Sequence, residues 1–230
     1  MRENVLLYFI YLRLKFIYIL LILLISIHDL RNMNFYLSEI KLVIKGQGNH
    51  YFLYNNFNPE PSEVIINNVI KDSGIKSYTF TEELNTVFIK FNKSIISCEN
   101  MFYGLANITE IDLSNFDTSK VVSMGAMFHL CSNLERIYFG NINTSSVKRI
   151  NNLFSRCTKL TSIDVSNFNT SSVTTMSSMF QFCESLTSID VSNFDTHNVE
   201  DMYDMFGYNT KLITVKVSNF NTSKVKIFLK

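Results

Sequence analysis

Apolar residues recur along the second half of the chain at a fixed interval of 26 residues. A phenylalanine, an asparagine and a threonine each return in the same register over five successive units. These three columns are Phe102, Phe128, Phe154, Phe180 and Phe206; Asn115, Asn141, Asn167, Asn193 and Asn219; and Thr118, Thr144, Thr170, Thr196 and Thr222. A constant period of about 20 to 50 residues is typical of solenoids, in which each unit buries its apolar face against the next.

Within one unit, the apolar spacing predicts a short helix followed by a short strand. Val121, Met124 and Phe128 would share one face of a helix over about residues 119–130, with a threonine as its N-cap. Residues 134–139 alternate as a strand does. One strand and one helix per repeat predict an α/β fold: a right-handed solenoid with a parallel sheet.

The region before the repeats follows a period of two instead of 26. Residues 36–45, 63–66 and 86–91 each predict a strand. We therefore expect a small β-rich N-terminal cap over residues 31–91, ahead of a solenoid of about five units over residues 92–230 whose last unit is incomplete. An independent ligand-binding β-domain is the alternative interpretation of this region.

Residues 1–30 carry a basic leader and then an apolar run over residues 16–27. This pattern predicts a cleaved signal peptide, with an uncleaved signal-anchor and a buried core segment as alternatives. A signal peptide or a signal-anchor would place the protein outside the cell or at its surface. Any contact with the membrane would then be through this segment alone.

The segments Leu160–Val173 and Met176–Cys183 resemble the BspA-like leucine-rich-repeat surface proteins. The resemblance covers roughly Ser94–Lys230 and implies a leucine-rich-repeat-like fold. It also implies a secreted or surface-displayed microbial protein, with adhesion or host-protein binding in some members. Asn141 lies seven positions after Leu134, where the general leucine-rich pattern has eight, so ligand-binding rules of other repeat classes do not transfer.

Charge and motif content narrow the functional classes. The formal net charge of +1 gives no basic footprint for nucleic acid. We find no nucleophile–base pair, phosphate loop, metal-ligand spacing or cofactor motif, so we expect a protein that is not an enzyme. Cys131, Cys157 and Cys183 form a column that could hold one disulfide, although buried thiols are favoured.

The outward face of the predicted sheet is the candidate recognition face, and its candidate residues are Arg136, Tyr138, Asp164, Asp190 and Lys216. The neighbouring aspartates suggest either a weak calcium site or, as we favour, a solvated face. The leading hypothesis is an exported repeat protein that binds a protein or glycan ligand at the cell surface. A structural coat component and an intracellular repeat scaffold are the alternatives.

Two further features concern modification and assembly. Five N-x-[ST] sequons, Asn92, Asn107, Asn143, Asn169 and Asn221, are candidate glycosylation sites, although three of them also follow from the repeat consensus. The apolar pattern continues into the last residues of the chain, so an uncapped end of the solenoid is a candidate for self-association.

Overall fold

Strands make up the regular structure of residues 38–226, the part of the chain that the computed structural model describes. The predicted signal or anchor segment lies outside these residues. The strands are β1 (Ser38–Lys45), β2 (Gly48–Tyr51), β3 (Glu63–Ile66), β4 (Val69–Lys71), β5 (Ser77–Phe80), β6 (Leu84–Phe91), β7 (Ile108–Asp112), β8 (Arg136–Tyr138), β9 (Ser188–Asp190) and β10 (Thr214–Lys216).

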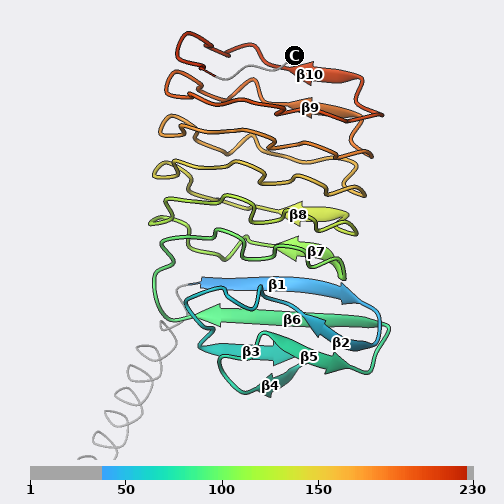
Figure 1. Cartoon of the computed structure of the whole chain (residues 1–230). Coiled ribbons are helices and arrows are strands. Elements are labelled where there is room, and N and C mark those ends of the chain that lie inside the picture. Colours follow the sequence, from blue (N-terminus) through green and yellow to red (C-terminus); the bar gives the residue numbers. More distant parts are fainter. Residues whose placement is uncertain (1–37, 227–230) are drawn as a thin grey trace, which may run out of the picture. The chain divides into compact units, whose positions relative to one another are not determined.

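A six-stranded mixed sheet joins the N-terminal region to the first repeats (Figure 1). Its order is β4-β3-β6-β1-β7-β8. β1 pairs antiparallel with both β6 and β7, and the parallel pairing begins only between β7 and β8. Alternate residues of β1 are buried, which is the burial pattern that its period of two predicts. The strands predicted at residues 36–45, 63–66 and 86–91 are therefore present.

The predicted α/β class is wrong, because the described residues contain no helix and form a β-rich fold with mixed and antiparallel pairing. The leucine-rich-repeat-like solenoid of one strand and one helix per unit is overturned with it. In place of the helix, each unit has consecutive turns interrupted by residues with positive φ. Ala126 and Leu130 have φ of 53° and 63°, and Asn152 and Arg156 have 55° and 64°. An α-helix requires φ near −63° throughout, so two left-handed residues four apart exclude one.

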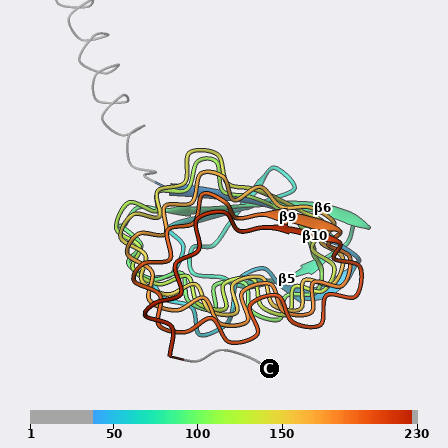
Figure 2. The same ribbon diagram turned by 90° about the horizontal axis from the view of Figure 1, so that it is seen from above.

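Successive 26-residue units lie one above another and are hydrogen-bonded along the side that carries these turns (Figures 1 and 2). Parallel bridges connect Ser97, Ser123, Arg149, Thr175 and Asp201 in sequence. In the turns themselves, every second amide donates to the unit above. The Phe128 amide, for example, donates to the Leu153 carbonyl at 3.0 Å, and the Phe154 amide to the Met179 carbonyl at 2.9 Å. In a helix, these amides would donate to carbonyls of the same unit and could not link it to the next.

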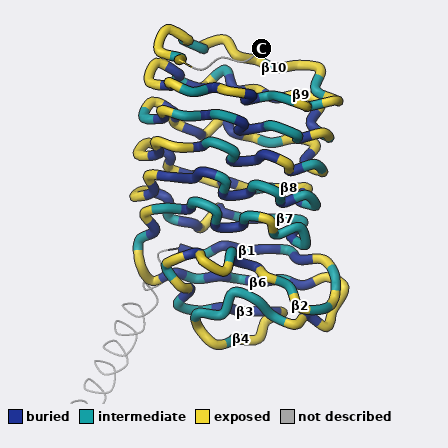
Figure 3. Tube along the Cα trace, in the orientation of Figure 1, coloured by how far each residue is buried: buried dark blue, intermediate teal, exposed yellow. Residues whose placement is uncertain are grey.

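The phenylalanine column forms a continuous stack of rings through the core. Ring centroids lie 5.8, 5.5, 5.4 and 5.8 Å apart from Phe102 to Phe206, and Phe154 at the centre is fully buried. Figure 3 shows that buried positions continue from unit to unit. Apolar burial of this kind is the largest stabilising contribution available to a repeat stack.

The threonine column joins neighbouring units, so its predicted role as a helix cap is wrong. The buried Thr144 hydroxyl donates to the Asn169 carbonyl at 2.9 Å and accepts from the Asn169 amide at 2.7 Å. Thr118 and Thr196 make the same pair of bonds to the unit above. Each threonine thus satisfies two main-chain groups that burial would otherwise leave unpaired.

The four cysteines are free and buried. The Cys131, Cys157 and Cys183 thiols each donate to the carbonyl of a phenylalanine 29 residues earlier, at 3.0 to 3.2 Å. Burial raises the pKa of Cys131 and of Cys183 to about 12, so both stay protonated at neutral pH. They act as small core residues, as we favoured from the sequence.

Candidate recognition face

The strand side of the repeats is interrupted at its third unit. β7 pairs with β8, and β9 with β10, but residues 162–164 between β8 and β9 form no strand. Within the described chain, no hydrogen bond between main-chain groups links residues 161–165 to either neighbouring unit. The peptide groups of residues 161–164 therefore have no main-chain partner on a face where the other units use theirs for pairing, while the buried Val165 carbonyl accepts from Asn193 Nδ2 at 3.1 Å.

Phe139 distinguishes the unit below this interruption. The same column holds Leu113, Val165 and Val191 in other units, all with smaller side chains. The Phe139 ring is nearly buried and meets the Phe168 ring edge-on, with centroids 4.9 Å apart. We infer that its extra volume between the second and third units prevents their strands from pairing.

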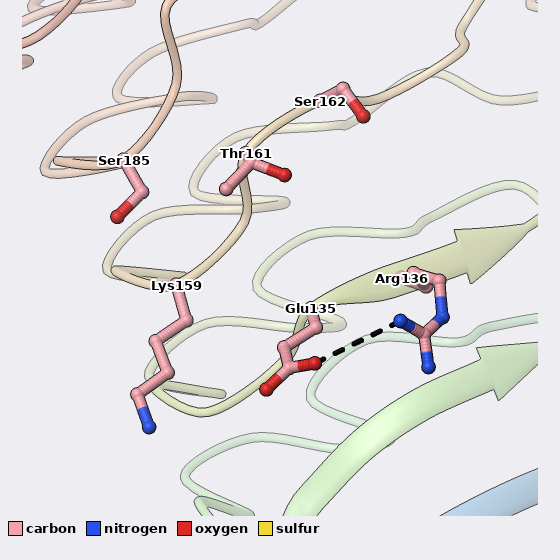
Figure 4. A pocket seen from close by; sticks show the side chains of 6 residues that line it. All are labelled: Glu135, Arg136, Lys159, Thr161, Ser162 and Ser185. Atoms are coloured by element: carbon pink, nitrogen blue, oxygen red, sulfur yellow. Dashed lines mark ion pairs between the residues drawn. The ribbon is translucent and has the colours of Figure 1, made fainter.

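Three hollows surround the unpaired segment. The largest, of about 450 Å³, is lined by Glu135, Arg136, Lys159, Thr161, Ser162 and Ser185 (Figure 4). A second, of about 340 Å³, includes Tyr138 and Asp164, and a third, of about 360 Å³, includes Asp164 and Asp190. The interruption of pairing and the concave surface thus occur at the same place.

Both basic residues predicted for this face pair with a carboxylate of the unit below. The Arg136 guanidinium lies 2.9 Å from the Glu110 carboxylate, and the Lys216 ammonium lies 3.0 Å from Asp190. The hydrogen bond and charge of Glu110 raise the pKa of Arg136. Glu135 also approaches Arg136, at 3.8 Å (Figure 4). All of these groups are at the surface, where single ion pairs add little stability.

The two predicted aspartates close local turns. Asp164 accepts from the Ser166 amide at 3.0 Å, and bonds from Ser166 lower the pKa of its carboxyl. Asp190 accepts from the Ser192 hydroxyl and amide, and these bonds, with a smaller effect of Lys216, lower its pKa to about 2. Lys216 thus offsets the charge of Asp190, and no cluster of three or more potential metal ligands occurs in residues 38–226.

Comparison with protein families gives a match to the family described as "Mycoplasma protein of unknown function, DUF285". Two overlapping matches cover residues 76–162 and 132–229, which is more than half of the chain. The chain belongs to this family. Searches of curated proteins and of solved structures gave no match. The DUF285 match supports the predicted repeat surface protein at the level of the family, and its description assigns no function.

The five sequons all lie within the residues that the DUF285 family model matches, and they differ in their surroundings. Asn92, Asn143 and Asn169 are exposed. Asn143 and Asn169 each accept through Oδ1 from a serine two residues on. Asn107 is less accessible, since its Nδ2 donates to the Lys45 carbonyl at 3.2 Å. Glycosylation at these positions stays a prediction.

Sequence reasoning missed the residues that line the largest hollow beside Arg136. Lys159 and Ser185 precede the predicted strands, and the alternation within the predicted strand put Thr161 on the side opposite Arg136 and Tyr138, so none of the three was assigned to the face. A usable signal was present in the sequence: the second unit has Phe139 where the other units have a smaller aliphatic residue, which marks the junction between the second and third units as different.

No helix among residues 38–226 has the length and apolar character needed to cross a membrane.

Proposed function

We propose that this protein is an exported or surface-displayed repeat protein, akin to the BspA-like leucine-rich-repeat surface proteins, that binds a protein or glycan through its strand side. It has no catalytic activity in this proposal, and nucleic acid is not a partner. The observation that carries the proposal is the hollowed polar surface around residues 161–165, where the repeat leaves peptide groups open. Concave surfaces with a few convergent polar groups are the usual locations of ligand sites.

The contrast between the two sides of each unit supports this assignment. On the turn side, main-chain groups and side chains are used for stacking, as the Thr144 bonds and the Phe154 ring show. On the strand side, Tyr138 is 45% exposed and has no counterpart in the other units. Individual exposed residues on a rigid repeat scaffold are what a specific ligand requires.

Localisation and binding test the proposal separately. Protease treatment of intact cells should remove a C-terminally tagged full-length chain, whereas protection of the tag until lysis would contradict surface display. For binding, purified protein is applied to arrays of glycans and extracellular proteins. Tyr138→Ala should weaken the selected interaction at least about tenfold. Tyr51→Ala is the matched control, because Tyr51 is 46% exposed but belongs to β2 of the N-terminal region and not to the strand side of the repeats.

Equal loss in both variants, or in neither, would remove the strand side as the binding surface. A surface-located chain without any ligand would instead support a structural coat component.

A further inference from the structure

Several polar side chains at the largest of the three hollows have no hydrogen-bond partner within the described chain. In the described chain, no hydrogen bond is made by the hydroxyls of Thr161, Ser162 or Ser185. The Lys159 ammonium, which lies at the same hollow, forms no ion pair there. These groups are left to solvent, and a ligand can replace that solvent without breaking any bond of the protein.

Charge at the hollow is uneven. Arg136 directs its Nε to Glu110 and one terminal nitrogen toward Glu135, so it keeps further donors for a ligand. Arg136 is thus paired with two carboxylates, whereas Lys159 is the lining charge for which no ion pair forms in the described chain. Figure 4 shows Lys159, Glu135 and Arg136 along one rim and the three hydroxyl-bearing side chains along the other. The ligand that fits therefore has an acidic group at one end and several hydroxyls.

The geometry points to an acidic glycan: we propose that this hollow binds a saccharide unit that carries a carboxylate or sulfate. Lys159 receives the acidic group, the donors of Arg136 that its carboxylate partners leave free bind neutral sugar oxygens, and the hydroxyls of Thr161, Ser162 and Ser185 exchange hydrogen bonds with those of the sugar. The volume of about 450 Å³ lies within the about 300 to 1,000 Å³ of small-ligand sites. This assignment rests on the proposed function and names its ligand class.

A peptide is the less suitable ligand for this hollow. Peptides commonly bind open strands by adding to the edge of a sheet. The main-chain groups of residues 161–164 lie between two other units, β8 below and β9 above, so a peptide strand could pair with them only by separating units of the same chain. Side-chain hydroxyls and ammonium groups remain for recognition, and these suit a polyhydroxylated ligand.

Three probes of similar length test the assignment by calorimetric titration of the full-length chain: a hyaluronan hexasaccharide, a neutral chitin hexasaccharide and a hexaglutamate peptide. We expect the acidic saccharide to bind at least about tenfold more tightly than the other two. Equal affinity for the neutral saccharide would overturn the acidic assignment. Tighter binding of the peptide would overturn the glycan assignment, and absence of saturation by all three would overturn the site.

Variants with opposite expected signs locate the bound probe. Lys159→Gln should weaken hyaluronan binding about tenfold, the effect of one charge-assisted contact. Glu135→Gln should strengthen it, because the carboxylate that competes for Arg136 is gone. Lys148→Gln removes an equal charge from an exposed lysine on the turn side and should leave affinity unchanged. If Lys148→Gln weakens binding as much as Lys159→Gln, the attraction is a general charge effect and the site is wrong.

The proposed function fails by a different result. A chain that stays inside the cell in the protease experiment contradicts surface display, even where hyaluronan titrates. A chain at the surface that binds a protein or a neutral glycan through Tyr138 retains the proposed function, while the acidic-glycan assignment fails.

Discussion

The turn side and the strand side of the repeat stack join neighbouring 26-residue units in different ways. On the turn side, bridges run without a break from Ser97 to Asp201. On the strand side, pairing stops at the third unit, between β8 and β9. The stack therefore does not depend on a continuous strand ladder. Its continuity comes from the turn side and from the rings and hydroxyls inside.

This division separates stability from recognition. Core positions such as Phe154 and Thr144 repeat because every unit must fit the next one. The strand side can lose its pairing locally and still be held by the rest of the unit, so substitutions there are tolerated. Repeat proteins gain stability from each interface between neighbouring units, so the loss of strand pairing at one unit removes only part of the total.

The largest effect should come from the ring stack on the buried side of this comparison. Phe154→Ala removes the central, fully buried ring and should lower the free energy of unfolding by about 3–5 kcal/mol, measured by denaturant titration. Tyr138→Ala on the strand side is the control and should change stability by no more than about 0.5 kcal/mol. Comparable losses in both variants would mean that the strand side carries stability after all.

The threonine bonds between units come next. Thr144→Val keeps the shape but leaves the amide and carbonyl of Asn169 without their buried partner, which should cost about 1–3 kcal/mol. Thr174→Val is the matched control, because the exposed Thr174 hydroxyl makes one bond, to the Lys148 carbonyl. If both substitutions lower the free energy of unfolding equally in a denaturant titration, the buried bonds of Thr144 stabilise the fold no more than the exposed bond of Thr174.

The repeat period and its apolar columns could be predicted from the sequence, because stacking requires the same residue at the same place in each unit. The absence of the predicted helix could not be predicted in the same way. Turns with a hydrogen bond to the third residue place side chains at intervals of three, so Val121, Met124 and Met127 fit either structure. Left-handed φ is common for Asn152, but Leu130 and Arg156 give no such signal, and only the unit above explains their conformation.

The candidate face was predicted in part. Alternation within the strands placed Arg136 and Tyr138 at the surface, where the structure has them exposed. Their partners depend on register between units, so the ion pair of Arg136 with Glu110 follows from the period alone. The hollow beside residues 161 and 162 does not follow from the period, because whether neighbouring strands pair depends on how side chains such as Phe139 and Phe168 pack between the units.

Reducing the bulk of Phe139 tests the cause of the difference between the two sides. Phe139→Val should allow residues 161–165 to pair with β8 and slow amide hydrogen exchange at Thr161 and at position 139 on the order of tenfold, because in the paired units Glu135 donates to the unit below and Leu113 to the unit above. The reciprocal change, Val191→Phe, should accelerate hydrogen exchange of the amide of residue 191. In the unchanged chain this amide donates to the Lys216 carbonyl of β10. Exchange that is unchanged in both variants would show that side-chain volume in this column does not control pairing.

The smallest effect concerns the charges on the strand side. The pKa of Asp190 is about 2, against 3.8 for an ordinary aspartate, so its folded state binds the proton less readily than the unfolded chain. Its contribution to stability is present above about pH 4 and is lost as pH falls toward about 2. Carboxyl-carbon NMR titration should show Ser192→Ala raising this pKa more than Lys216→Gln does, because the bond from the Ser192 hydroxyl is the largest single cause; the bond from the residue-192 amide remains in the variant. Lys224→Gln is the control, since Lys224 donates to Asn198. A larger shift from Lys216→Gln than from Ser192→Ala would mean that pairing between units, and not the local turn, sets the charge of this face.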